Sequence, residues 1–500
     1  MGGIDTIPGV YPGISPVRSG TCKPRKILTM SRFLLGHSVQ AHNNSLANLC
    51  RGVGERVLFR NRELLKPVAP KTGVFEIRLA KFRDLLFKDI GFQSPVTHDQ
   101  FVGYYKGPRK LIYQRAVNGL ALLPVRPRDA FLKTFVKAEK LNYDIKPDPA
   151  PRVIQPRDPR YNVEVGCFLR PLEHKLYNSV DKLFGSPTIM SSYNAFTQAL
   201  HLKAKWDRFS TPCCVGMDAS RFDQHVSIPA LQFEHSVYNR LFRSRKLAML
   251  LKMQLRNRGM ARASDGYFRY ETKGSRMSGD MNTSMGNKLL MCLMSKAYLD
   301  SLGVPYEFAN NGDDCLIFTE RKYLKKLETL KKYYRDFGFD VVTETPVFDF
   351  EQVEFCQTRP VCVNSTWRMV RNVKTCLTKD VTSVNLGHDV EMYRRLLRDI
   401  GKCGLASAAD VPVLGSFYRM LERFGVEGNY MGAWDTEYNY YFRSSRNAAC
   451  KYSAPDSYGR YSFWLSTGIS PDAQVSIESY FDDSIWGADK RQFIDQLLPI

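Results

Sequence analysis

One short stretch, Asn310-Asn311-Gly312-Asp313-Asp314, constrains the fold of this chain more than any other. Runs rich in β-branched and aromatic residues flank it, at 304–309 and 315–318. Asn-Gly between two such runs is a strong signal for a β-hairpin. The sequence therefore predicts a hairpin with two adjacent carboxylates at its tip. Neighbouring aspartates on a turn repel each other, and a divalent cation would remove that repulsion.

A second pair of carboxylates lies upstream. Residues 212–217 are a short apolar run that predicts a buried strand, and Asp218 ends it. A carboxylate at the end of a buried strand is costly unless it is paired or holds a metal ion. Asp223 follows after a predicted turn. In isolation the Asp-x4-Asp spacing is a weak signal, because Asp also caps helices.

Glycine and small polar residues precede a predicted apolar helix over residues 283–299. Gly279 permits a close backbone approach, and Ser278, Thr283 and Asn287 carry groups that can hydrogen-bond a ligand. Thr283 and Asn287 are four residues apart, so they share a helix face. The same segment also suits an ordinary helix start capped by Ser278 or Asn282, and both interpretations can hold together.

Basic residues are in excess, with 72 Lys+Arg against 50 Asp+Glu and a formal net charge of +22. Most of the excess lies in the first 200 residues, which favours a polyanionic partner such as nucleic acid. A solubilising surface or attraction to an anionic membrane are the alternatives. Residues 131–160 are dense in cations on a predicted strand–loop–strand, which suits a wall that holds phosphates.

The other segments are mostly predicted helices. Residues 1–30, rich in Gly, Pro and basic side chains, predict an extended arm. Helices are expected over 45–66, 73–90, much of 165–208, and a lysine-rich 321–337. The basic 45–66 helix is either a solvated face or one wall of an RNA channel. Aromatic residues gather after residue 430, and a packed core is favoured there over base stacking (Trp434, Tyr438, Tyr440, Tyr441, Trp464, Trp486).

Cysteine usage and hydropathy exclude several classes of protein. The 12 cysteines are scattered without a Cys-x-x-Cys pair, which argues against a zinc site and a disulfide framework. We expect most of these thiols to be core residues in a reducing compartment. The sequence has no apolar run of 18 residues, so it predicts no membrane-spanning helix.

Taken in chain order, the motifs form a recognisable set. The basic segment is followed by Asp218-x4-Asp223, then Ser278-Gly279-x3-Thr283-x3-Asn287, then Gly312-Asp313-Asp314. Together they resemble the palm motifs of RNA-dependent RNA polymerases of positive-strand RNA viruses. Residues 42–46, 135–140 and 354–357 are most similar to tombusvirus-type plant virus replicases, and the flavivirus-related polymerases come next.

The resemblance implies a catalytic centre for two-metal nucleotidyl transfer. Asp218 and Asp313 would bridge two Mg²⁺ ions, with Mn²⁺ as a possible substitute. Asp314 would lie nearby and be less essential, and the backbone carbonyl of Ala219 would add a ligand. All three aspartates are therefore expected catalytic residues.

The resemblance also implies a nucleotide site. The incoming ribonucleotide would be bound through its ribose hydroxyls and backbone by Asp223, Ser278, Gly279, Thr283 and Asn287. Its triphosphate would be held by Lys137, Lys140, Arg152 and Arg160. A lysine within 322–332 would protonate the leaving pyrophosphate.

The implied fold is an α+β right hand. It consists of an N-terminal arm over 1–30, fingers over 31–205 with the basic segment 131–160, a palm over 206–360 and a helical thumb over 361–500. The palm has an antiparallel sheet and a fingers insertion around 225–270. The arm would help to bridge fingers and thumb.

Partners follow from the same resemblance. They would be viral RNA template and product, ribonucleoside triphosphates, a membrane-anchoring viral replication protein and host factors. Relatives are commonly longer, with an upstream portion that anchors replication to a membrane. We therefore expect the chain in the host cytoplasm at membrane-associated replication complexes, attached through a partner or through a part that precedes Met1.

Three rival functions remain. A reverse transcriptase would share the palm, but it usually has an aromatic residue at the position of Asn311 and lacks the Ser-Gly-x3-Thr-x3-Asn segment. A non-catalytic RNA-binding protein explains the charge but leaves the carboxylates unexplained. A degenerate polymerase used as a scaffold is the third.

Overall fold

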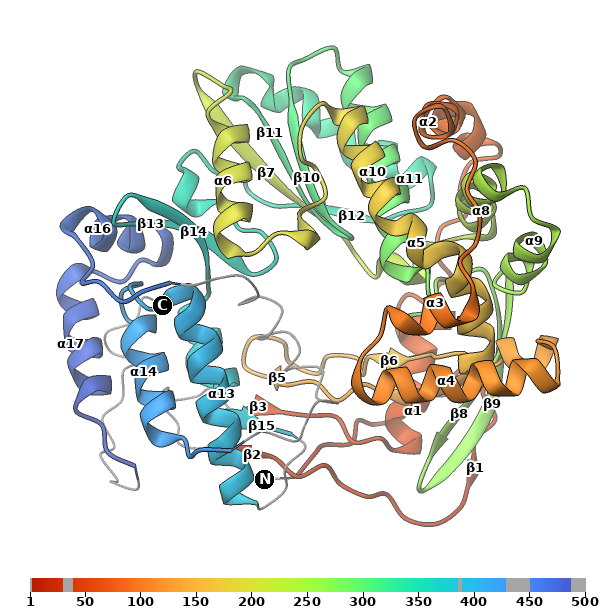
Figure 1. Cartoon of the computed structure of the whole chain (residues 1–500), viewed down its shortest axis with the longest axis horizontal. Coiled ribbons are helices and arrows are strands. Elements are labelled where there is room, and N and C mark those ends of the chain that lie inside the picture. The colour runs from red at the N-terminus through yellow and green to blue at the C-terminus, as the bar shows by residue number, and fades with distance from the viewer. Residues whose placement is uncertain (1, 30–38, 385–388, 429–449, 487–500) are drawn as a thin grey trace.

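A computed structural model describes residues 2–29, 39–384, 389–428 and 450–486 (Figure 1). Helices and sheets are mixed, as the α+β prediction requires. The strands are β1 (Val17–Arg18), β2 (Leu28–Thr29), β3 (Val39–Gln40), β4 (Leu132–Val136), β5 (Leu141–Asn142), β6 (Val153–Ile154), β7 (Pro212–Ala219), β8 (Arg256–Ala263), β9 (Gly266–Lys273), β10 (Glu307–Asn311), β11 (Asp314–Glu320), β12 (Val341–Thr343), β13 (Thr358–Val363), β14 (Thr366–Arg371) and β15 (Thr382–Ser383). The α-helices are α1 (Leu46–Val53), α2 (Val74–Ile90), α3 (His98–Gly103), α4 (Gly107–Leu122), α5 (Pro159–Phe184), α6 (Ala195–Trp206), α7 (Phe222–His225), α8 (Ile228–Phe242), α9 (Arg245–Lys252), α10 (Thr283–Ser301), α11 (Leu330–Asp336), α12 (Val373–Thr375), α13 (Val390–Ala408), α14 (Leu414–Phe424), α16 (Ser457–Thr467) and α17 (Pro471–Asp482). Segments of other helix types are η1 (Gly54–Leu58), η2 (Pro127–Ala130), η3 (Met190–Ser192), η4 (Arg321–Thr329), η5 (Phe350–Gln352) and η6 (Cys376–Asp380).

We refer to a four-stranded antiparallel sheet, in the order β10-β11-β7-β12, as the central sheet, because the largest hydrophobic cluster packs against it. One face of the sheet joins the largest hydrophobic cluster, which it shares with α2, α5, α8 and α10. The opposite face packs on α6 through Leu202 and Trp206. Because both faces are covered, β7 and β11 are continuous apolar runs. The β10–β11 turn of this sheet is the predicted hairpin.

A five-stranded sheet in the order β1-β9-β8-β4-β6 lies beside α1. Alternation along the strands directs Leu132, Ala261 and Phe268 to the face that packs on α1. The long β8–β9 hairpin, which follows α9 in the chain, therefore joins the sheet of the basic segment rather than the central sheet. Figure 1 shows this hairpin at the right-hand edge of the molecule.

The N-terminal arm is extended, as predicted, and is anchored at two distant places. β1 pairs with β9, and β2 pairs with β15. α13, α14, α16 and α17 form a separate helical cluster with the β13–β14 hairpin (Figure 1). The arm thus connects the five-stranded sheet to the segment that precedes this helical cluster.

Two predicted helices differ from the structure. The 45–66 helix ends early, because α1 passes into the π-turn η1 and Phe59 is extended. The chain then folds back, so that Arg62 reaches Glu55 at 3.3 Å, a contact that local periodicity does not predict. The lysine-rich 321–337 helix begins as the 3₁₀ segment η4 and becomes α-helical only at Leu330.

Other sequence expectations can be compared directly. All twelve cysteines are free thiols, and most of them are buried, as expected of core residues. Across the described ranges, none of the helices has the length and apolar character needed to cross a membrane. Of the C-terminal aromatic residues, Trp486 contacts Phe424 at the helical cluster, whereas Trp464 is exposed. Trp434, Tyr438, Tyr440 and Tyr441 lie outside the described residues.

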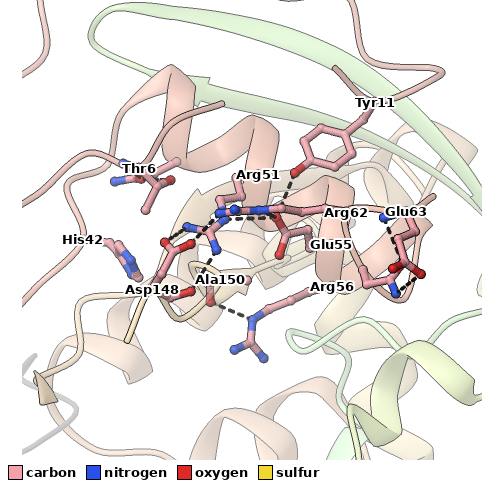
Figure 2. Close-up of polar contacts among 12 residues, drawn as sticks. Thr6, Tyr11, His42, Arg51, Glu55, Arg56, Arg62, Glu63, Asp148 and Ala150 are labelled. Atoms are coloured by element: carbon pink, nitrogen blue, oxygen red, sulfur yellow. Dashed lines mark hydrogen bonds and ion pairs between the residues drawn. The ribbon is translucent and has the colours of Figure 1, made fainter. Parts of the chain in front are cut away.

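The arm and α1 are tied together by a buried polar network (Figure 2). Arg51 binds Glu55 at 3.0 Å and the Asp148 carbonyl at 2.9 Å, and the Tyr11 hydroxyl donates to Glu55 at 2.9 Å. His42 is buried beside this network and contacts the Tyr143 hydroxyl at 3.0 Å. This network therefore holds together three segments that are far apart in sequence, namely the arm, α1 with η1, and the loop that contains Asp148.

His42 gives the protein an acid sensitivity. Burial, opposed by Glu139 and reinforced by nearby arginines, lowers the pKa of His42 from 6.5 to about 4. As pH falls from 6.5 towards 4, the unfolded chain binds a proton that the folded chain does not bind. The free energy of unfolding should therefore fall over this range by up to about 3 kcal/mol. Unfolding measured at a series of pH values should show less of this loss in His42→Gln, and an identical pH profile in the variant would contradict the assignment.

Candidate active site

The β10–β11 hairpin places two aspartates at one end of the central sheet. Asn311 pairs with Asp314, so Gly312 and Asp313 form a two-residue turn. Gly312 has φ +89°, as the first residue of a type II′ turn requires. The Asn310 side chain braces the turn by accepting from the Gly312 N–H at 3.1 Å and donating to the Gly312 carbonyl at 2.7 Å. The predicted hairpin is confirmed, and the turn is stiff.

Asp218 lies on the neighbouring strand β7, opposite Asp314 in the register. The Ala219 N–H donates to the Asp313 carbonyl at 3.4 Å, which brings the hairpin tip onto the end of β7. Partial burial and the charge of Asp313 raise the pKa of Asp218. Asp218 and Asp313, which the family resemblance assigns to the metal ions, are thus close enough to repel each other.

Asp314 is held differently from Asp313. Its Oδ2 accepts from the Cys356 N–H at 2.7 Å. Burial raises the pKa of Asp314 to about 6, against the lowering effect of this hydrogen bond. Cys356 has φ +52°, so a strained turn presents that N–H to the carboxylate. One oxygen of the Asp314 carboxylate is therefore already hydrogen-bonded to the backbone of the protein.

Glu344 is a fourth carboxylate of the region, and sequence reasoning missed it. It follows β12, and its side chain lies against Gly216 of β7, where a Cβ would come within 2.0 Å of Glu344 Oε2. Burial, Glu354 and Asp218 raise the pKa of Glu344. No motif marks this residue in the sequence, because only the pairing of β12 with β7 brings it near Asp218.

The carboxylates fit a cation that takes part of its coordination from a substrate. In the described part of the chain, no three His, Cys, Asp or Glu side chains converge as a complete metal site. Mg²⁺ is usually bound by one or two carboxylates together with waters and substrate phosphates. Asp218 and Asp313 supply hard oxygen donors of that kind, with Asp314 and Glu344 behind them.

A polar cavity of about 460 Å³ opens beside Asp313 and Asp223. Its cationic lining residues are Arg56, Lys137, Lys146, Arg152, Arg221 and Arg276. Arg56, Lys146 and Arg221 were not predicted to be site residues, because the loop and helix that carry them are brought here only by tertiary packing. Burial and the neighbouring Arg152 and Arg221 lower the pKa of Arg56 to about 10. This crowding of cations favours a polyanionic ligand.

Asp223 lies at the wall of the cavity within a chain of hydrogen bonds. The Asn287 Nδ2 donates to Asp223 Oδ1 at 2.7 Å, and Asn287 Oδ1 accepts from Arg276 Nε at 3.0 Å. Arg276 forms an ion pair with Glu234, and both side chains are fully buried. Burial raises the pKa of Asp223, while Asn287 opposes that shift. The network fixes the orientation of Asp223 and of the Asn287 amide.

The hydroxyl groups of Ser278 and Thr283 form hydrogen bonds with backbone groups of the protein. The Ser278 hydroxyl, which lines the cavity, accepts from the Gln155 N–H at 3.2 Å and donates to the Val153 carbonyl at 3.3 Å. Gly279 runs against Pro156, whose Cα would lie 2.5 Å from an added Cβ, so the expected close approach is present. Thr283 donates to the Met277 carbonyl at 2.7 Å and does not line the cavity.

The predicted triphosphate residues divide into two pairs. Lys137 and Arg152 line the cavity, and both lie near Glu139, at 3.6 and 3.2 Å. Lys140 and Arg160 do not line it. The Lys140 Nζ donates to the Lys379 carbonyl at 2.5 Å.

Arg160 instead binds Asp129 at 3.3 Å and the Pro124 carbonyl at 3.0 Å. A triphosphate role for Lys140 or Arg160 has no support in this geometry, because neither residue lines the cavity. The lysines of 322–332 are also absent from the cavity lining, and Lys326 donates to the Leu302 carbonyl at 3.3 Å.

Comparison with known sequences gives a consistent result. A family model described as viral RNA dependent RNA polymerase matches residues 15–486. The chain is 43% identical over 459 residues to the RNA-directed RNA polymerase of Pothos latent virus, covering 91% of this chain and 61% of that protein. It is 42% identical over 468 residues to that of Turnip crinkle virus, covering 92% and 60%. It is 42% identical over 482 residues to that of Tobacco necrosis virus, covering 95% and 66%. The chain thus spans roughly three fifths of the length of these relatives.

Proposed function

Because the chain belongs to the viral RNA-dependent RNA polymerase family, we propose that it copies a positive-strand RNA genome by template-directed nucleotidyl transfer. The observation that carries this proposal is that Asp313 lines a cation-lined cavity and lies close to Asp218. Such a cavity suits a nucleoside triphosphate, whose α-phosphate would then lie near both carboxylates. A non-catalytic RNA-binding protein would not need carboxylates there.

We propose separate roles in phosphate binding, proton donation and metal binding for the residues in and beside the cavity. Lys137, Arg152 and Arg221 neutralise and orient the triphosphate, with Arg56 behind them. Lys146, whose charge opposes the raised pKa of Asp218, is the residue best placed to give a proton from its Nζ to pyrophosphate. A divalent ion held by Asp218 and Asp313, Mg²⁺ or Mn²⁺, would supply Lewis-acid stabilisation of the phosphoryl oxygens, with Asp314 and the Ala219 carbonyl as further donors.

We also propose an assignment of the chain to the parts of a right-hand polymerase. The arm is 1–30, the fingers are 31–205, the palm is 206–360 and the thumb is 361–500. The central antiparallel sheet supports the palm assignment. The pairing of β8 with β4 supports a fingers insertion around 225–270, extended to Lys273. The β2–β15 pairing and the Lys140–Lys379 contact support a bridge from the arm and fingers towards the thumb.

The proposed partners are viral RNA template and product and ribonucleoside triphosphates. A membrane-anchoring viral replication protein and host factors would place the chain at membrane-associated complexes in the host cytoplasm. The high positive charge supports the RNA partners. The protein partners rest on family resemblance alone.

Ribose selection tests the proposal against a reverse transcriptase. We expect wild type to extend an RNA primer with ribonucleotides far better than with deoxyribonucleotides. In Asn287→Ala, Asp223 loses its hydrogen bond and its fixed orientation, so the preference should fall about 10- to 100-fold. Single-nucleotide extension with matched pairs of nucleotides measures the ratio.

Thr283→Ala is the control for that measurement. It removes a hydroxyl on the same helix face that does not line the cavity, so it should leave the ratio close to wild type. Equal use of both sugars by wild type would instead support the reverse-transcriptase alternative.

A further inference from the structure

One face of the five-stranded sheet is open to solvent. Alternate residues of three neighbouring strands point away from α1 and are exposed: odd numbers over 131–135, even numbers over 256–262, and odd numbers over 267–273. We refer to these residues as the open sheet face. The polymerase site described above does not use them, and their partners on the buried face are apolar or hydrogen-bonded.

The open sheet face is strongly basic. It carries six cations and one carboxylate, Glu271 (Lys133, Arg256, Arg258, Arg262, Arg269, Lys273). Arg258 pairs with Glu271 at 2.8 Å, and Lys133 pairs with Asp158 at 3.1 Å. The other four cations form no ion pair or side-chain hydrogen bond with any residue that the structure describes.

The strand register places like charges opposite each other on the open sheet face, which destabilises the folded protein when no ligand is bound. Arg256 lies directly opposite Lys273 in the β8–β9 pair. Like charges in directly opposed positions destabilise an antiparallel pair. An anionic ligand with regularly spaced charges would offset that repulsion.

Aromatic rings are interleaved with these cations. Phe131, Phe135 and Tyr267 are 45%, 42% and 36% exposed. Tyr267 lies opposite Arg262, and Lys133 lies beside Met260, which lies opposite Arg269. A cavity of about 400 Å³ opens on this face, bordered by Phe131, Arg256 and Lys273 among others. Exposed rings on which bases stack, alternating with cations that bind phosphates, are the features of single-strand platforms.

We propose that the open sheet face binds single-stranded RNA outside the polymerase cavity. The eight residues of β8 span roughly 25 Å, enough for several nucleotides. Lys137, two residues beyond Phe135, lines the polymerase cavity, so RNA on this face adjoins the site. Cations and rings alternate across three strands, whereas a membrane contact needs an apolar face set apart from its charges. This binding does not depend on nucleotidyl transfer.

A charge-matched pair of triple variants tests the proposal. Arg256→Gln, Arg269→Gln and Lys273→Gln together remove three unpaired cations of the open sheet face. Arg109→Gln, Lys110→Gln and Arg115→Gln together remove the same charge from exposed positions of α4 that form no ion pair with a described residue. Thermal unfolding of both proteins checks that they fold like wild type.

The readouts are RNA affinity, its salt dependence and the position of cross-links. Unstructured RNA that contains 4-thiouridine should cross-link within 131–135 and 256–273 of wild type. The open-face variant should lose those cross-links and bind about tenfold more weakly, with a log–log salt slope reduced by about 2. The α4 variant should retain the cross-links and an affinity close to wild type.

The outcomes separate this proposal from its rivals and from the proposed function. Wild-type cross-links that fall only outside the open sheet face, or equal affinity of both variants, would overturn it. If the open-face variant lost binding to phosphatidylserine vesicles but kept its affinity for RNA, the open sheet face would instead be a membrane-binding surface. Primer extension at saturating RNA is a separate readout, because the open-face variant should raise the KM for RNA and leave kcat near wild type. A wild type that binds RNA here without extending primers would contradict the polymerase function alone.

Discussion

Asp218→Asn and Asp313→Asn should each abolish nucleotide addition, with a loss of about 10³-fold or more in the rate of primer extension. Each substitution keeps the size of the side chain but removes a negative charge that a divalent cation needs. The two carboxylates lie at the joined ends of β7 and the β10–β11 hairpin, where they can bind the same cation. RNA affinity should remain close to wild type, because phosphate contacts are spread over the basic surface.

Asp99→Asn is the matched control. Asp99 is exposed in the first turn of α3 and forms no ion pair with a described residue, so its substitution should leave extension unchanged. Asp314→Asn should cost less than either catalytic variant, because Asp314 is already held by the Cys356 N–H. Robust extension by Asp218→Asn would show that the metal ligands are misassigned, and loss of RNA binding with extension would indicate a folding defect.

Local motifs predicted the centre of this site well. The hairpin, the buried strand before Asp218 and the helix from Thr283 all follow from periodicity and turn chemistry, which act over short distances. Their order also identified the family. These elements needed no knowledge of tertiary packing, because each carries its own signal.

The parts of the site that local motifs could not place depend on long-range packing. Arg160 stands in a cation-rich segment, but its guanidinium turns to Asp129 and the end of α4. Arg56, Lys146 and Glu344 reach the site from segments without a motif, through the fold-back after α1, the 143–150 loop and the pairing of β12. Composition shows that cations are abundant but cannot say which ones converge.

We expect the buried ion pair between Glu234 and Arg276 to couple stability to the proposed ribose selection. Glu234 accepts from Arg276, from the Asn282 amide at 2.7 Å and from the Tyr238 hydroxyl at 3.0 Å, with no exposure to solvent. Glu234→Ala would leave the guanidinium buried without a counter-charge. We expect the free energy of unfolding to fall by about 3–5 kcal/mol, measured by urea or thermal unfolding. A change below about 1 kcal/mol would mean that Arg276 finds another partner or water.

The double variant Glu234→Met with Arg276→Met separates the two roles of this pair. Replacing both ions by apolar side chains of similar size removes the unpaired charge, so much of the lost stability should return. Arg276 Nε also donates to Asn287 Oδ1 at 3.0 Å, and Asn287 orients Asp223. The double variant should therefore fold well and yet discriminate poorly between ribonucleotides and deoxyribonucleotides. If the double variant recovers both its stability and its discrimination against deoxyribonucleotides, the ion pair acts only as a structural support. Asn287 would then orient Asp223 without the hydrogen bond from Arg276.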